Sequence, residues 1–455
     1  MPAAEFDLIV SGRIVTPSRV LEAGYVAVRG GRITAIGQDD PLPSARRSVR
    51  AEHAYVLPGI VDTHVHTRSE PAEGITRGTE SAVAGGVTTI ADMPYDMPAA
   101  VPDVETFVQK IADVDAQAVA DVALYGTIRK EGGLDQIERL ASAGACAFKL
   151  ATYEADPVRF PRIADGEMLA AFRRIAATGL PAAVHCENQD IADRGVAEER
   201  AAGRTGPLAH AWSRPPISET EAVGRVLELA YDTGVRLHIV HASVPRSFDL
   251  VQRYREEGVR VTAETCIQYL VLDEAAMERL GALAKINPPL RRCEHVDALW
   301  RYLAAGRIDQ VTSDHAPWAR SRKAEADIFR NASGASGVET LLPLLYHSGV
   351  ASGRISILEL VRLLAEQPAR TFGLFPRKGM LAPGADADIT ILDPEAVWTI
   401  RGKDLHSASG WTPYEGMEIR GRVVQTFVRG QPAYEDGVVV AHPGDGEFVR
   451  PAADA

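Results

Sequence analysis

The sequence predicts an α/β protein: a (β/α)8 TIM barrel with a small β-sandwich domain formed by the N- and C-terminal segments. Short apolar runs alternate with amphipathic helical stretches over residues 56–378, and β-rich runs separated by glycine-containing turns occupy residues 1–55 and 379–455. The length of 455 residues allows this arrangement, because an α/β barrel takes about 250 residues as one domain.

The two terminal segments have the same sequence pattern of short β-rich runs and tight turns. Residues 7–15, 25–29 and 32–36 are β-rich and are separated by turns such as Gly30-Gly31, as in an antiparallel sheet. The stretches KGMLAPGADADITILDP and RGRVVQTFVRGQPAY, near the other end, repeat this pattern without a long amphipathic helix. We therefore expect residues 1–55 and 379–455 to form one small β-sandwich domain.

The central segment, residues 56–378, is expected to form the barrel. Helices between consecutive strands force a parallel sheet, and eight parallel strands most often close into a barrel whose active site lies at their carboxyl ends. The candidate strands are Val56–Val61, Thr88–Asp92, Val122–Tyr125, Ala145–Leu150, Ala182–His185, Arg236–His241, Val259–Glu264 and Asp309–Ser313.

Composition and charge exclude several classes of partner. The chain has 49 basic and 61 acidic residues, a net charge of −12, and it has no basic tract, which argues against nucleic acid or an anionic membrane. No apolar run approaches the roughly 20 residues of a membrane helix. The beginning of the chain lacks the pattern of a secretory signal, so we expect a cytoplasmic protein with reduced cysteines.

Polar residues gather where the candidate strands end. His64 and His66 follow the first strand, and the two-residue period of an extended chain points both imidazoles the same way. A lone pair of this kind is weak evidence, but Lys149, His185, His241 and Asp314 end four other strands. Charged and imidazole groups meeting at one barrel mouth must be paired or bind metal.

The neighbours of these residues have simpler explanations. His238 lies three residues before His241 and should point to the other side, where it packs or hydrogen-bonds. His315 should face away from Asp314, and Cys186 and Glu187 are candidates for orienting His185. Lys149 does not fit a metal site directly, because a protonated amine repels a divalent cation.

The motifs HVH, FKL, HCEN, VHAS and SDHAP, with KGMLAPGADADITILDP, make the chain resemble the binuclear-metal amidohydrolase superfamily. The similarity covers essentially the whole chain and is greatest to the cyclic amidases: allantoinases, hydantoinases/dihydropyrimidinases and dihydroorotases. The resemblance implies a carbamate, formed from CO2 on Lys149, that bridges two divalent metal ions, with zinc the expected ion. It further implies one metal held by His64, His66, Lys149 and Asp314, and a second held by Lys149, His185 and His241.

The implied reaction opens a cyclic amide, a ureide or an imide. A hydroxide bridging the two metals would attack the amide carbon, because metal binding lowers the pKa of water. Asp314 would be the catalytic acid and base that passes the proton to the leaving nitrogen.

The substrate is predicted less directly. HCEN, SRP, LAKINPPLR and TPYEGM resemble allantoinases, whereas ETCIQYL resembles hydantoinases. Arg68 is placed as in dihydroorotases, where it would bind a carboxylate, but it is equally well explained as a solvated arginine. The dihydroorotase Met-Pro-Asn motif is absent, and Asp96 stands where allantoinases usually have asparagine. Allantoin is therefore the leading substrate, with hydantoinase/dihydropyrimidinase-like and dihydroorotase-like activities as alternatives.

Three further residues are candidates for substrate binding. Asn287 precedes two prolines in a turn that, in this family, presents backbone groups to the ring. Tyr153 lies four residues after Lys149, whereas hydantoinases place an oxyanion-binding tyrosine five residues after their lysine; packing under the loop is its alternative role. Ser333 replaces a hydantoinase asparagine, so backbone amides near Gly337 are expected to contact substrate instead.

Two other classes of function fit the sequence less well. The family includes non-catalytic scaffold proteins that have lost metal ligands, but every expected ligand is present here. A mononuclear deaminase would usually lack the strand-four lysine. Relatives commonly form oligomers, so we expect a homodimer or homotetramer with a small-molecule substrate.

Overall fold

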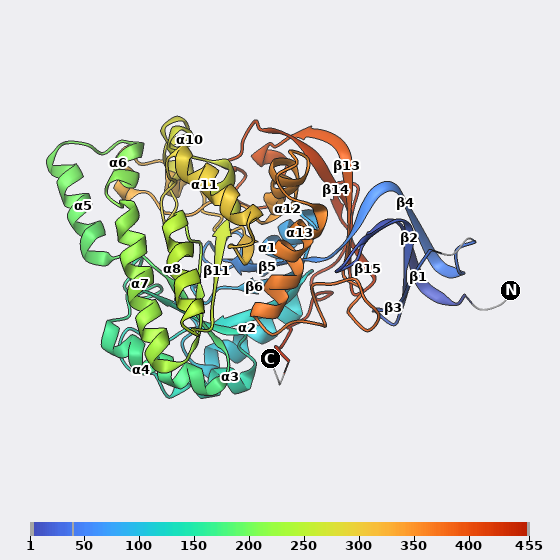
Figure 1. The fold of residues 1–455 in the computed structure, drawn as a ribbon, viewed down its shortest axis with the longest axis horizontal. Helices are drawn as coiled ribbons and strands as arrows, with labels where there is room; N and C mark the ends of the chain where they lie inside the picture. The colour runs from blue at the N-terminus through green and yellow to red at the C-terminus, as the bar shows by residue number, and fades with distance from the viewer. Residues whose placement is uncertain (1–3, 39–40, 453–455) are drawn as a thin grey trace.

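The computed structural model describes residues 4–38 and 41–452, and it contains a TIM barrel and a separate mixed β-sheet (Figure 1). The predicted fold class is confirmed. The extreme ends of the predicted sandwich domain, residues 1–3 and 453–455, lie outside the described residues, as do residues 39–40.

The barrel consists of parallel strands arranged in chain order, from β5 to β12. Its two end strands are joined by hydrogen bonds: His66 N–H donates to the carbonyl of His315 (2.8 Å), and the amide of Ser313 donates to Asp62 Oδ1 (3.3 Å). These bonds close the barrel beside two predicted metal ligands. The strands are β5 Ile60–Val65, β6 Val87–Asp92, β7 Asp121–Gly126, β8 Ala147–Ala151, β9 Pro181–His185, β10 Arg236–Ile239, β11 Val261–Cys266 and β12 Gln310–Thr312.

Helices surround the barrel, and local signals fix their ends. Asp103 and Asn188 cap α2 and α5 by accepting hydrogen bonds from the amides of Thr106 and Ile191, while glycines with positive φ end α3, α4 and α7. The α-helices are α1 Gly74–Ala84, α2 Val104–Gln117, α3 Gln136–Ala143, α4 Asp165–Thr178, α5 Gln189–Ala201, α6 Pro207–Trp212, α7 Pro216–Thr233, α8 Pro245–Glu256, α9 Ile267–Val271, α10 Glu274–Leu280, α11 Cys293–Ala304, α12 Leu341–Leu345, α13 Ile357–Val361 and α14 Gln367–Thr371.

Shorter helical turns complete the connections. Two π-helical segments, η5 Tyr346–Val350 and η6 Arg362–Glu366, continue α12 and α13. The 3₁₀ turns are η1 Gly281–Ala284, η2 Arg320–Lys323, η3 Ile328–Arg330, η4 Val338–Thr340 and η7 Gly402–Asp404.

The second sheet joins both ends of the chain. Its order is β16-β15-β14-β13-β4-β1-β2-β3, so the amino-terminal strands extend away from the barrel and the carboxyl-terminal strands lie between (Figure 1). The strands are β1 Phe6–Val15, β2 Val20–Arg29, β3 Arg32–Gly37, β4 Ala45–Pro58, β13 Ile389–Thr399, β14 Glu418–Val428, β15 Gln431–Glu435 and β16 Val438–Val439.

Two details of the sequence prediction were wrong. The first barrel strand is Ile60–Val65, not Val56–Val61, because residues 56–58 end the long strand β4 and pair with β13 in the other sheet. No strand was predicted over residues 45–55, which belong to β4 and pair with β1 in parallel, whereas the predicted runs 7–15, 25–29 and 32–36 pair antiparallel as expected. The sheet also curls: Ile33 N–H donates to the carbonyl of Ala385 (3.0 Å), which brings β3 back beside the segment leading into β13.

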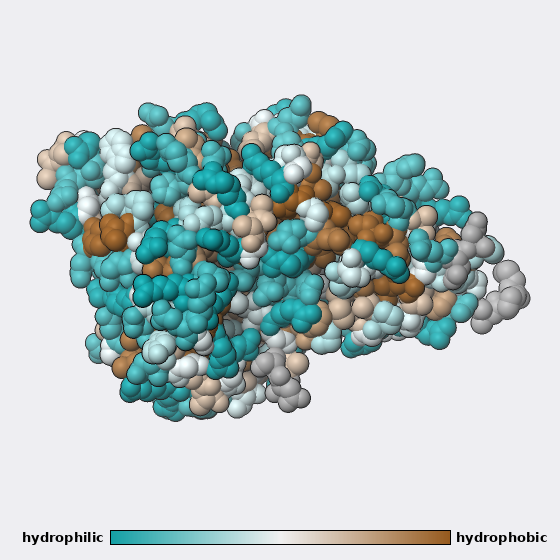
Figure 2. All heavy atoms as spheres, in the orientation of Figure 1, coloured by the Kyte–Doolittle hydropathy of each residue, from teal (hydrophilic) through white to brown (hydrophobic). Residues whose placement is uncertain are grey.

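The apolar core follows the barrel strands, whose residues are almost all buried. This is the pattern expected of strands covered on both faces. The surface in Figure 2 is mainly hydrophilic, and its largest hydrophobic area lies where β13–β15 meet the helices α12 and α13.

A buried ion cluster links the barrel to the terminal sheet. Lys378 Nζ lies 2.9 Å from Asp386 and 2.7 Å from Asp388, and it also pairs with Asp121 at the start of β7. Arg429 supplies a second positive charge to Asp121. These cations compensate a group of three carboxylates that could otherwise hold a metal ion.

We expect Lys378→Met to lower the free energy of unfolding by about 3–5 kcal/mol, because it leaves buried carboxylates without their principal counter-charge. Chemical denaturation of the full chain measures this change. The exposed Lys403→Met is the control and should alter stability by about 0.5 kcal/mol or less. Equal stability of the two variants would contradict the assigned role of Lys378.

Candidate active site

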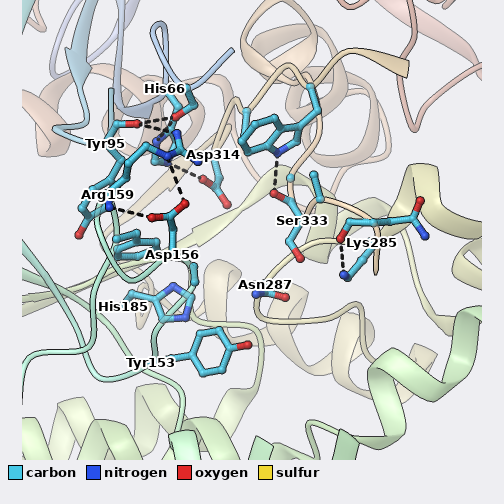
Figure 3. A pocket seen from close by; sticks show the side chains of 18 of the residues that line it. His66, Tyr95, Tyr153, Asp156, Arg159, His185, Lys285, Asn287, Asp314 and Ser333 are labelled. Atoms are coloured by element: carbon cyan, nitrogen blue, oxygen red, sulfur yellow. Dashed lines mark hydrogen bonds and ion pairs between the residues drawn. The ribbon is translucent and has the colours of Figure 1, made fainter. Parts of the chain in front are cut away.

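A cavity of about 450 Å³ lies at the carboxyl ends of the barrel strands (Figure 3). It is the position in which barrel enzymes carry their chemistry. Every predicted metal ligand lines it: His64, His66, Lys149, His185, His241 and Asp314.

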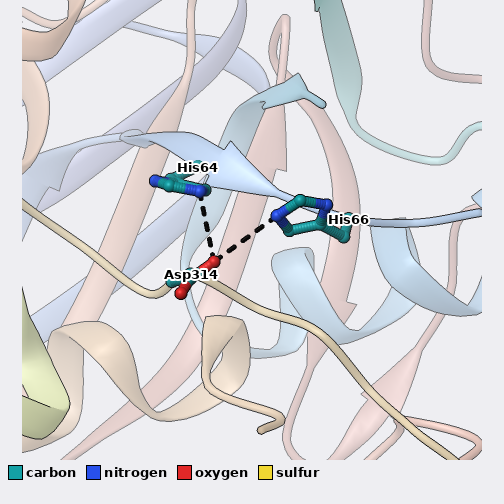
Figure 4. Close-up of side chains that lie close together, drawn as sticks. All are labelled: His64, His66 and Asp314. Atoms are coloured by element: carbon teal, nitrogen blue, oxygen red, sulfur yellow. Dashed lines mark ion pairs between the residues drawn. The ribbon is translucent and has the colours of Figure 1, made fainter. Parts of the chain in front are cut away.

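The first group of ligands comes from β5 and from the end of β12. Asp314 Oδ1 lies 3.1 Å from His64 Nε2 and 3.4 Å from His66 Nε2, so three ligand atoms face one another (Figure 4). Burial lowers the pKa of His64 to about 4, with the charge of Lys149 as the next cause. The imidazole is therefore neutral, as a metal ligand must be.

The second group of ligands consists of His185, at the end of β9, and His241, two residues after the end of β10. His185 Nδ1 and His241 Nε2 are 2.8 Å apart, and the rings of His64 and His241 stack with centroids 5.3 Å apart. Lys149 lines the same cavity, with Nζ 3.3 Å from His64 Nε2. Burial lowers the pKa of Lys149 to about 8, so a fraction of its amine is neutral near physiological pH.

Two of these residues adopt an unusual backbone conformation. His241 and Asp314 have φ angles of +40° and +47°, in the left-handed region that side chains other than glycine rarely occupy. Strain of this kind persists where the surrounding structure demands it, and it is concentrated at functional sites. The turn after each strand thus directs a ligand into the cavity.

Glu264, on β11, positions several ligands and was not singled out from the sequence. Its carboxylate lies 2.6 Å from His64 Nδ1 and 3.1 Å from His238 Nε2, and it accepts a hydrogen bond from the amide of His241 (3.1 Å). Burial alone would raise the pKa of Glu264, but its contacts with the imidazoles of His64 and His238 hold it well below its usual value. A carboxylate behind a ligating imidazole fixes the orientation of the ring.

Glu187 plays the same part for the second group. Its Oε2 lies 2.8 Å from His185 Nε2, which confirms the predicted contact, and Arg214 Nε lies 3.4 Å from Oε1. Burial raises the pKa of Glu187, but the hydrogen bond from His185 and the charge of Arg214 lower it further than burial raises it. Cys186 instead donates to the carbonyl of Val184 (3.4 Å) and does not orient His185.

The expectations for the two other histidines are confirmed. His238 is fully buried and bonds Thr262 and Glu264 behind the ligands. His315 turns away from the cavity, with Nε2 3.2 Å from Glu73.

Two of the predicted substrate contacts line the cavity. The hydroxyl of Tyr153 accepts a hydrogen bond of 2.6 Å from Arg214 Nη2. Asn287 Oδ1 is buried and has no hydrogen-bond partner among the described residues. Such an atom costs free energy unless a ligand satisfies it.

The other two predicted contacts lie elsewhere. Arg68 Nη1 bonds Asp113 (2.6 Å), and its Nε lies 3.6 Å from Asp96, outside the cavity wall. The amide of Gly337 donates to His315 Nδ1 (3.1 Å) instead of facing the cavity. The acceptors of these two donors, Asp113 and His315, are distant from them in the sequence, so no local pattern reveals either pairing.

Several loop residues that line the cavity were missed. Tyr95 stacks on Phe160 with ring centroids 3.9 Å apart, and Arg159 lies over the ring of Trp318 at 5.9 Å. All come from loops that follow barrel strands, where functional side chains are expected. That rule identifies the loops, but not which residues turn inward.

The donor set fits two borderline divalent ions. Imidazole nitrogens and a carboxylate oxygen are suitable ligands for zinc. His241 Nδ1 is a buried atom with no partner among the described residues, whereas the other ring nitrogen faces His185.

Comparisons with known proteins agree with this geometry. The model of the "Amidohydrolase family" matches residues 55–433. An allantoinase from Rubrobacter xylanophilus is 40% identical over 450 residues, and an L-hydantoinase from Paenarthrobacter aurescens is 35% identical over 451; each alignment covers 98% of both chains. The solved structure of "L-Hydantoinase (Dihydropyrimidinase) from Arthrobacter aurescens" superposes with a TM-score of 0.95 at 34% identity, covering 98% of this chain and all of that one.

Among the described residues, no helix is both long and apolar enough to cross a membrane. Within the same part of the chain the four cysteines are free; Cys146, Cys186 and Cys266 are buried and Cys293 is exposed.

We expect Glu264→Gln to weaken zinc binding roughly 10- to 100-fold, because the amide cannot orient and polarise His64 as the carboxylate does. Competition between the metal-free protein and a chromophoric chelator measures the affinity. Glu256→Gln, on the exposed face of α8, is the matched control. Unchanged affinity in Glu264→Gln would contradict the role given to this carboxylate.

Proposed function

Because the chain belongs to the amidohydrolase family and is a cyclic amide hydrolase, we propose that its substrate is allantoin, whose ring it opens by hydrolysis. The observation that carries this proposal is the set of buried ligands around Lys149 at the end of a cavity whose wall contains the unsatisfied Asn287 Oδ1. In the reaction, water adds across an amide C–N bond: a C–O bond forms, the C–N bond breaks and the nitrogen takes a proton.

We propose that two divalent ions, preferably zinc, bind here, with a carbamate formed from CO2 on Lys149 between them. His64, His66 and Asp314 would hold one ion, and His185 and His241 the other, with the carbamate shared. The ions supply a polarised carbonyl and an acidified water.

The chain's own residues then position the ring and move the proton. Asp314 would accept a proton and return it to the leaving nitrogen. Burial raises its pKa, but its contacts with His64 and His66 lower it below the usual value, so the side chain is present as the carboxylate that can take up a proton. Tyr153, held by Arg214, and Asn287 would hydrogen-bond the ring. These contacts would hold the scissile bond close to Asp314.

Hydantoin is the second candidate, because the superposition at a TM-score of 0.95 is with an L-hydantoinase. Allantoin is preferred since the relative with 40% identity is named an allantoinase. Dihydroorotate is disfavoured, because Arg68, its expected carboxylate ligand, is paired with Asp113. A non-catalytic scaffold is disfavoured by the retention of all six ligands.

The small-molecule substrate is consistent with the family. Assembly into homodimers or homotetramers and a cytoplasmic location stay predictions.

The proposal is tested with protein reconstituted with zinc and bicarbonate and assayed on allantoin, hydantoin, dihydrouracil and dihydroorotate. We expect the highest kcat/KM for allantoin and metal-dependent ring opening that a chelator abolishes. A higher kcat/KM for hydantoin or dihydrouracil would assign the chain to the second candidate. The absence of turnover on every ring would contradict the proposed reaction.

A further inference from the structure

Two buried lysines lie beside the cavity without an acidic partner. Lys285 and Lys323 are each 6% exposed, and across residues 4–38 and 41–452 neither forms an ion pair with a carboxylate. Lys285 Nζ donates to the backbone carbonyl of Asn331, and Lys323 Nζ donates to the carbonyl of Lys285 (2.9 Å). Lys285 lines the cavity, whereas Lys323 lies behind it.

Such an arrangement is costly for the folded protein alone. A buried ammonium group without a counter-charge is unfavourable, and burial, followed by the charge of Arg214, lowers the pKa of Lys285 to about 7. A group of this kind is usually retained for a ligand rather than for stability.

The cavity around Lys285 is rich in hydrogen-bond donors. Arg214 and Arg322 also line this part, and Arg322 lies 5.0 Å from the centre of the Trp318 ring without an acidic partner among the described residues. Asn287 lies two residues after Lys285, and both side chains reach the cavity (Figure 3). Lys285 and Arg322 therefore offer hydrogen-bond donors to the cavity that no carboxylate of the described residues occupies.

We propose that Lys285 is a specificity-determining residue that donates a hydrogen bond to an oxygen on the substituent of the substrate ring. The substituent would be a ureido or a carboxylate group, and alkyl or aryl substituents would be disfavoured because they leave the buried donors unsatisfied. This inference rests on the proposed function and adds to it the class of ring that is accepted.

The test compares hydantoins whose substituents have the same number of heavy atoms and a similar shape: ureido (allantoin), carboxymethyl and isobutyl. Unsubstituted hydantoin reports on ring opening alone. The variants are Lys285→Met, Lys285→Gln and the matched control Lys323→Met, which removes an equally buried lysine that does not line the cavity.

We expect Lys285→Met to lower kcat/KM for the ureido and carboxymethyl rings about tenfold or more, while the values for the isobutyl ring and for unsubstituted hydantoin stay within about twofold. Lys323→Met should preserve the wild-type order of substrates. Lys285→Gln distinguishes recognition of a neutral oxygen from recognition of a charge. If the charge of a carboxylate is recognised, this variant should keep kcat/KM for the ureido ring and lower it for the carboxymethyl ring. Thermal denaturation checks that both methionine variants remain folded.

Equal changes of kcat/KM for the ureido and isobutyl rings in Lys285→Met, or the same selective loss in Lys323→Met, would overturn this inference while leaving ring hydrolysis established. If the wild-type enzyme opened none of the rings, the proposed function would fail, and the inference with it.

Discussion

The buried carboxylate of Glu264 is the interaction on which the arrangement of the site depends. It contacts the rings of His64 and His238 and the backbone amide of His241, so it connects β5, β10 and β11 at one point. Without an acceptor there, the imidazoles at the barrel mouth would be buried with unsatisfied nitrogens. This one anion fixes the ring of His64 and the backbone of His241, while Glu187 fixes the ring of His185.

The extent to which buried polar groups have partners differs between the two ends of the barrel. At the amino-terminal end of β7, Lys378 and Arg429 neutralise a carboxylate cluster, and every charge there has a partner within the protein. At the carboxyl ends of the strands, Asn287 Oδ1 has no hydrogen-bond partner and Lys285 has no carboxylate partner among the described residues. The fully paired charges around Lys378 stabilise the junction of the barrel and the sheet. The groups without such partners at the cavity are available to a substrate.

Sequence patterns predicted the barrel and brought the six ligand candidates together, because strand period and strand order determine which side chains meet at a barrel mouth. The first strand was misplaced since Val56 continues an apolar run into Ile60, although the run is divided between two sheets. Arg68 could not be placed, because its partner Asp113 lies on a helix 45 residues away. Arg214 and Lys285 were missed for a related reason. Both lie in loops that form the cavity wall, and the periodic patterns that identify strands and helices do not predict how loops fold.

The central claim is that one buried site holds two metal ions bridged through Lys149. Anomalous diffraction from crystals of the zinc- and bicarbonate-treated protein tests it most directly. The account predicts two anomalous peaks, one among His64, His66 and Asp314 and the other between His185 and His241, with electron density for a carboxylated Lys149 joining them. A single peak, or an unmodified Lys149 beside two fully occupied ions, would contradict it.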